Sequence, residues 1–189
     1  MSSSVYASGI TNFISNIHVL EEDYGILVSS STSRRPSVGM IVDALEHFMD
    51  IVRYANNRRS AGTTVKINSE ADVQDAIYFM LKPWIRDLTF ESPTEKVAGR
   101  YVVEDFRSRV MRCTIEAKYI RDARHGREIS KELHDDIEMY SRSKDIDHIV
   151  FFIYDPDAQI VDPDDLKAHI SRDRSINGRQ VQTYILIKP

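Results

Sequence analysis

One short run of apolar residues, His148 to Tyr154, constrains the fold of this 189-residue chain more than any other feature. Seven residues is a typical β-strand length and far too few to cross a membrane as a helix. The run is almost continuously apolar, so in a strand it would place apolar side chains on both faces of the sheet. Such a strand belongs in the middle of a sheet that is covered on both sides.

Helical periodicity supplies the covering elements, because apolar residues three and four positions apart line one face of a helix. This spacing predicts helices over 38–55, about 70–82 and about 127–142, and Pro163 suits the start of a short helix that reaches about Ser171. The further predicted strands are 88–91, about 101–109, 112–120 and 180–188. This order predicts an α/β sandwich, a mixed sheet flanked by helices.

The first 60 residues differ in character from the rest. Segment 9–28 is apolar at near-helical spacing, and segment 29–37 is rich in Ser, Arg and Pro, as linkers are. We therefore expect a helical extension and linker over 1–60 and a main domain over 61–189. The helix over 38–55 has two interpretations: it packs on its own domain, or it binds a second copy or a partner protein.

Composition argues against a strongly basic nucleic-acid binder, a disulfide-bonded protein and a membrane-spanning protein. The net charge is −4, so the chain lacks the strongly basic balance of many nucleic-acid binders, and contact with phosphates would need a local patch. The single cysteine, Cys113, cannot form an internal disulfide. No apolar run approaches the ~18 residues of a membrane-spanning helix, and the first residues lack signal-peptide features. We expect a cytoplasmic protein.

The candidate catalytic residues are Asp105 and the segment Glu116-Ala117-Lys118, which begins eleven positions later. Residues two apart on a strand share a face, so Glu116 and Lys118 project together, and a hairpin places Asp105 across from Glu116. Two carboxylates can hold Mg²⁺, and an adjacent lysine can position or help deprotonate a water molecule. The same pattern also fits an ordinary hairpin with a surface Glu–Lys pair.

The flanking segments make the pattern more specific. Asp105-Phe106 and Ile115-Glu116-Ala117-Lys118-Tyr119 resemble motifs of the DpnII/MboI-type restriction endonuclease domain, a branch of the PD-(D/E)xK nuclease superfamily. Further similar segments are 70–76, 90–94, 98–99, 133–140 and 152–156. The resemblance covers about residues 68–171, and residues 1–60 have no counterpart in it.

This resemblance implies a restriction-endonuclease-like α-β-β-β-α-β core and a Mg²⁺-dependent endonuclease, for which Mn²⁺ can substitute. It implies DNA as the substrate and a role in bacterial, antiviral defence or restriction. Asp105 and Glu116 would bind the metal ion, and Lys118 would assist the attacking water. Glu91 is a further metal candidate or else a surface acid. Their positions on helix faces make Gln74 and Glu132 supporting candidates. Arg107 and Arg109 stand where the family tends to carry apolar residues, and they either contact DNA or form a solvated sheet edge. Arg124 and Arg127, in a basic segment, are further possible DNA contacts.

Several alternatives stay open. A nuclease-like fold can also serve as a catalytically weak binding or assembly module in a defence complex, and the same three residues would suit a ribonuclease. Asp136 lies inside an apolar helical stripe, where it either pairs with the site lysine or has a structural role. Glu70 either supports the site or lies at a helix edge. His125 is expected in a basic loop, where it contacts DNA or is solvated.

Overall fold

The computed structural model describes residues 36–57, 66–93, 103–176 and 178–189. These residues belong to one compact unit, Pro36–Pro189. The apolar segment 9–28 and nearly all of the expected linker lie outside the described residues.

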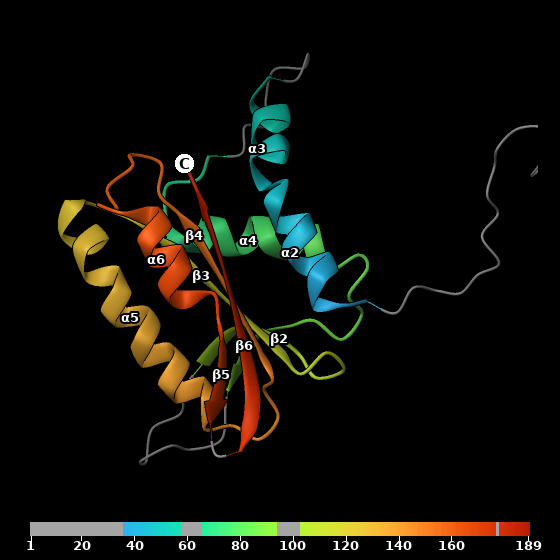
Figure 1. Cartoon of the computed structure of the whole chain (residues 1–189). Coiled ribbons are helices and arrows are strands. Elements are labelled where there is room, and N and C mark those ends of the chain that lie inside the picture. Colours follow the sequence, from blue (N-terminus) through green and yellow to red (C-terminus); the bar gives the residue numbers. More distant parts are fainter. Residues whose placement is uncertain (1–35, 58–65, 94–102, 177) are drawn as a thin grey trace, which may run out of the picture. The chain divides into compact units, whose positions relative to one another are not determined.

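A mixed sheet of six strands in the order β1-β2-β3-β4-β6-β5 forms the centre of the unit (Figure 1). The strands are β1 (Thr89–Pro93), β2 (Val103–Ser108), β3 (Cys113–Tyr119), β4 (His148–Tyr154), β5 (Asp173–Ile176) and β6 (Arg179–Lys188). Strands β3, β4 and β6 run parallel to one another, and the outer pairs are antiparallel. The apolar run from His148 to Tyr154 is β4, inside the sheet as predicted.

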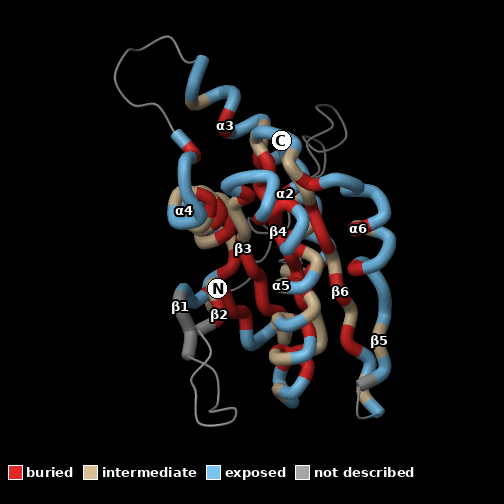
Figure 2. Tube along the Cα trace, turned by 90° about the vertical axis from the view of Figure 1, so that its left-hand side faces the viewer, coloured by how far each residue is buried: buried red, intermediate tan, exposed pale blue. Residues whose placement is uncertain are grey.

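Helices cover both faces of this sheet, so the predicted α/β sandwich is confirmed. On one face lie α2 (Val38–Glu46), α3 (Phe48–Asn57) and α4 (Glu70–Leu81), and on the other lie α5 (Ala123–Ser141) and α6 (Pro163–Ile170). Each face of the sheet has its own apolar core: the first core lies under α2, α3 and α4, and the second lies under α5 and α6. Strand β4 contributes Val150 and Phe152 to the first core and Phe151 and Ile153 to the second. Figure 2 shows buried positions running through the inner strands, as this double burial requires.

The expected single helix over 38–55 is two helices that meet at His47. The backbone N–H of His47 donates to the carbonyl of Ala44 at 3.1 Å, which closes the last turn of α2. Ile41, Leu45 and Phe48 are fully buried in the same core as α4. The apolar face of this segment therefore packs on its own domain, and α2 and α3 belong to the compact unit.

Helix α5 begins at Ala123, four residues before its expected start. The Asp122 carboxylate accepts the backbone N–H of His125 at 2.8 Å and caps the helix. The next residue in the helix, Gly126, permits a close approach to another segment. A Cβ on it would lie 2.3 Å from the carbonyl oxygen of Gln159. His125 consequently lies in the first helical turn, not in a loop.

The strand β5 was not predicted. It is a polar edge strand that pairs antiparallel with β6 across a turn at Gly178, where φ is +77°. Its sequence, DRSI, has no apolar alternation to announce a strand. An edge strand has one neighbour and little burial, so it needs no such pattern.

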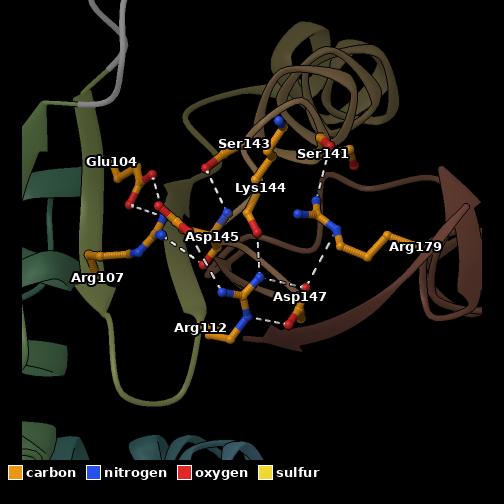
Figure 3. A network of polar contacts seen from close by, with 9 residues as sticks. All are labelled: Glu104, Arg107, Arg112, Ser141, Ser143, Lys144, Asp145, Asp147 and Arg179. Atoms are coloured by element: carbon orange, nitrogen blue, oxygen red, sulfur yellow. Dashed lines mark hydrogen bonds and ion pairs between the residues drawn. The ribbon is translucent and has the colours of Figure 1, made fainter. Parts of the chain in front are cut away.

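Polar contacts fix the start of β3, just after the turn that joins it to β2. Arg112 adopts a φ of +50°, and its guanidinium pairs with Asp147 and with the carbonyl of Lys144 (Figure 3). Arg179, at the start of β6, lies 3.5 Å from the same Asp147 carboxylate. These contacts tie together the amino ends of β3, β4 and β6. The carboxyl end of β3, which carries Glu116 and Lys118, is the other end of that strand.

Candidate active site

The site is built first by the pairing of β2 with β3. Phe106 lies opposite Ile115, so the next position of the ladder brings Asp105 opposite Glu116. One carboxylate oxygen of Asp105, Oδ2, accepts the backbone N–H of Ala117 at 2.9 Å. The structure thus brings together the two motifs that the sequence placed eleven residues apart.

Strand alternation separates Ala117 from its two neighbours, as predicted. Ala117 is fully buried in the first core, whereas Glu116 and Lys118 project together on the other face. The Lys118 ammonium lies 3.0 Å from Oε1 of Glu116. Glu116 is only 6% exposed, so this is an ion pair largely withdrawn from water.

Helix α5 supplies a second set of contacts to the same two residues. The Tyr140 hydroxyl donates to Oε2 of Glu116 at 2.6 Å. Oδ2 of Asp136 lies 3.2 Å from the Lys118 ammonium. Asp136 and Tyr140 are four residues apart and share one face of the helix. Of the two interpretations of Asp136, pairing with the site lysine is the one that the structure shows.

Burial and mutual repulsion shift the titration of these groups. The pKa of Glu116 is raised to about 7: burial and the Asp105 and Asp136 carboxylates raise it, and Lys118 and the Tyr140 hydrogen bond oppose the rise. Burial also raises the pKa of Asp136. For Lys118, burial alone would lower the pKa, but the Glu116 and Asp136 carboxylates outweigh it and raise the pKa above its usual value. Lys118 is therefore an ammonium ion at neutral pH.

A fourth carboxyl group, that of Glu70, comes from the start of α4. Desolvation in the site raises its pKa, Lys118 opposes that shift, and Asp105 adds to it. The sequence left Glu70 open between a supporting role and a helix edge, and the structure places it within the electrostatic reach of Asp105 and Lys118. In the sequence, the position of Glu70 on the same helical face as Gln74 was the feature that indicated a place near the site.

Of these groups, Glu70 and Lys118 line a cleft of about 520 Å³. The cleft is lined by Asn68, Ser69, Glu70, Ala71, Lys118, Tyr119, Arg121, His125 and Glu132. His125 is buried in its wall, where Nδ1 accepts the Arg121 backbone N–H and Nε2 lies 3.4 Å from Oε2 of Glu132. Glu132, a predicted supporting residue, thus lines the cleft.

For two other predicted site residues, Gln74 and Glu91, the described part of the structure gives a position but no side-chain contact with the site. Gln74 is half-buried on α4, one turn after Glu70. Position 91 lies on β1 between the pairs Phe90–Phe106 and Ser92–Glu104, which puts it opposite Asp105 in the ladder. The side chain of Glu91 lies outside the described residues, so its part in metal binding stays a prediction.

The four arginines predicted to contact DNA fall into two groups. Arg107 is buried, and its guanidinium donates to Oε1 of Glu104 at 2.9 Å and to the carbonyl of Asp145 at 2.8 Å (Figure 3). These contacts give Arg107 a structural role. Arg109, Arg124 and Arg127 are exposed, and Arg124 pairs with Glu128 on the helix surface. DNA contact stays a prediction for these exposed arginines.

The donor set fits a hard divalent cation. Glu70, Glu116 and Asp136 each interact electrostatically with the Lys118 ammonium, and Asp105 is close enough to raise the pKa of all three carboxyl groups. A bound cation would relieve this repulsion. In the described part of the chain no group of three or more Asp, Glu, His or Cys side chains is arranged so that it could hold a metal ion. Mg²⁺ does not need one, since it typically binds one or two carboxylates and keeps several waters.

Comparison with known proteins settles the family. The model of the restriction endonuclease family DpnII-MboI matches residues 39–189. The chain belongs to the DpnII-MboI family of restriction endonucleases. This membership assigns it to the nucleases, hydrolases that act on DNA, and the match includes nearly all of α2 and the whole of α3. No curated protein and no solved structure matches the chain. Across the described ranges no helix is long and apolar enough to cross a membrane.

Proposed function

We propose that this chain is a Mg²⁺-dependent endonuclease that hydrolyses DNA phosphodiester bonds in bacterial restriction or defence, in the cytoplasm. One observation carries the proposal. Asp105 contacts the backbone of β3 beside Glu116, Glu116 pairs with Lys118, and Lys118 lines a cleft and also pairs with Asp136. Phosphodiester hydrolysis needs a metal site, a water molecule and a positive charge, and these residues provide for all three.

Each residue has a separate role in this proposal. Asp105 and Glu116 would hold Mg²⁺ or Mn²⁺, with Glu91 as a further ligand and Gln74 and Glu132 in support. When bound, the ion supplies Lewis acidity and a more acidic water molecule. Lys118 carries a raised pKa, so it acts as a cation that orients the water or neutralises phosphoryl charge. It is poorly suited to take up a proton, because it already holds one.

DNA would approach over the cleft wall formed by the start of α5. Arg121 lines the cleft, and Arg124 and Arg127 follow on the exposed side of the helix. With a net charge of −4, binding would depend on such local arginines. Phosphate contacts release counterions, so DNA affinity would fall steeply with salt.

A homodimer through residues 38–55 is part of the proposal, now limited to the side of α3 that the core leaves free. Ile51 and Tyr54 are 46% and 77% exposed there, and Phe79 of α4 is 74% exposed. Two copies would present one active site to each strand of a duplex, as two-fold symmetry allows. Ile51→Glu is expected to shift the mass measured by light scattering from dimer to monomer, and an unchanged mass would contradict this contact.

The activity is tested with supercoiled plasmid, in Mg²⁺ and in EDTA. We expect the wild type to cut in Mg²⁺ alone, and Asp105→Asn and Lys118→Met to lose at least about 100-fold in rate. Asp135→Asn, an exposed neighbour on α5, is the matched control and should cut normally. Wild-type cleavage in EDTA, or full activity of both site variants, would refute the proposal. Tight binding of a partner protein without any cleavage would favour the assembly-module alternative, and cleavage of RNA alone would favour the ribonuclease.

A further inference from the structure

Lys118 is shared between two carboxylates. Its ammonium lies 3.0 Å from Glu116 and 3.2 Å from Asp136, and its side chain is 13% exposed. Within the described ranges, Lys118 is the one cation that pairs with Asp136. Asp136 therefore has a partner in the site and none elsewhere in that part of the chain.

Packing does not explain why an acid stands at position 136. Its neighbours on this face of α5 are Leu133, Ile137 and Tyr140, all buried in the second core. A carboxylate in such surroundings is costly unless it is paired. The side chain that pairs with it is the proposed catalytic lysine, so the reason for the acid lies in the site.

The two oxygens of Glu116 have different partners. Oε2 accepts a hydrogen bond from the Tyr140 hydroxyl, and Oε1 accepts one from the Lys118 ammonium. A metal ion bound by Asp105 and Glu116 would compete with the ammonium ion for Glu116, because both are cations. Asp136 lies within contact distance of the same ammonium and offers it a second carboxylate.

We propose that Asp136 is a positioning residue. It would hold the Lys118 ammonium in the site when a metal ion displaces that ammonium from Glu116. This inference rests on the proposed function, since it needs a cation at Asp105 and Glu116. Without the charge of Asp136, Lys118 depends on Glu116 alone. It then competes more strongly with the ion, and it has no carboxylate to hold it once the ion binds.

The test measures ion binding without DNA, by isothermal titration of the full chain with Mn²⁺. Asp136→Asn keeps the shape of the side chain and removes its charge, and we expect it to weaken Mn²⁺ binding about tenfold, a typical effect of residues that orient metal ligands. In a Lys118→Met background the same substitution should change the affinity less than about threefold, because its effect passes through the lysine. Asp135→Asn is the matched control and should bind as the wild type does.

The outcomes separate this inference from the proposed function. An equal loss in both backgrounds would mean that Asp136 attracts the ion directly, and no loss in either would mean that it does nothing; both overturn the inference and leave the metal site standing. A wild type that binds no Mn²⁺ overturns the metal site and the inference together. If Asp136→Asn does not fold, Asp136→Glu decides, because a retained charge should keep the affinity within about threefold. In cleavage assays, kcat should fall and KM should stay unchanged.

Discussion

Tyr140→Phe isolates the hydrogen bond that helix α5 gives to the site. The ring stays in place, and only the hydroxyl that donates to Oε2 of Glu116 at 2.6 Å is removed. Both residues are buried, at 2% and 6% exposure, so water does not readily replace the lost donor. A hydrogen bond to a buried ionised group contributes about 1.5–3 kcal/mol, and we expect the free energy of unfolding to fall by about 2 kcal/mol.

The size of this loss should depend on pH. Burial raises the pKa of Glu116 from 4.5 to about 7, and the Tyr140 hydrogen bond is one of the contacts that oppose this rise. Removing the bond therefore raises the pKa of Glu116 further and penalises its ionised form. Above pH 7 Glu116 is ionised and the full loss appears. Near pH 5.5 it is protonated, and the loss shrinks to that of a neutral hydrogen bond, about 1 kcal/mol.

Urea denaturation in EDTA, at pH 5.5 and pH 8.5, measures both values. Tyr54→Phe is the matched control, because Tyr54 is 77% exposed and its hydroxyl faces water. It should change stability by less than about 0.5 kcal/mol at either pH. A Tyr140→Phe loss below that size at pH 8.5, or an equal loss at both pH values, would refute this reasoning.

Three further predictions concern other parts of the chain. Gly126→Ala should lower the free energy of unfolding by about 1–3 kcal/mol in urea, because a Cβ would lie 2.3 Å from the carbonyl oxygen of Gln159. Gly39→Ala, with no atom closer than 3.8 Å, should be neutral or stabilising, and equal losses would contradict the close approach. Burial raises the pKa of the Cys113 thiol to about 12, so a thiol reagent at pH 8 should label it only in urea; rapid labelling of the native protein would contradict its burial. The logarithm of the DNA affinity should fall linearly with the logarithm of the salt concentration, and a flat response would argue against phosphate contacts.

The local sequence predicted those features that local periodicity determines. The continuous apolar run became the central strand β4, and strand alternation placed Glu116 and Lys118 on one face. The helix over 70–82 was also predicted to within a residue, because Ser69 and Asp72 form a capping arrangement that depends only on neighbours. Such signals lie within a few residues of the elements that they specify.

Features that depend on another part of the fold could not be predicted in this way. The polar edge strand β5 exists because β6 lies beside it. His125 was expected in a loop, because the sequence does not show that Gly126 lets this first turn of α5 pack closely against Gln159 from another segment. The hydrogen bond from Tyr140 to Glu116 joins residues 24 positions apart, and nothing local announces it. Helical spacing did put Asp136 on the buried face, but only the fold identified its partner.

The most direct test of the central claim is the anomalous diffraction of a crystal soaked in Mn²⁺. We expect one strong peak in contact with the carboxylates of Asp105 and Glu116, with Lys118 beside it and still paired with Asp136. A crystal of Asp105→Asn should lose the peak. A Mn²⁺ peak that touches neither carboxylate, or no peak in wild-type crystals, would contradict the metal-dependent active site at the carboxyl end of β3.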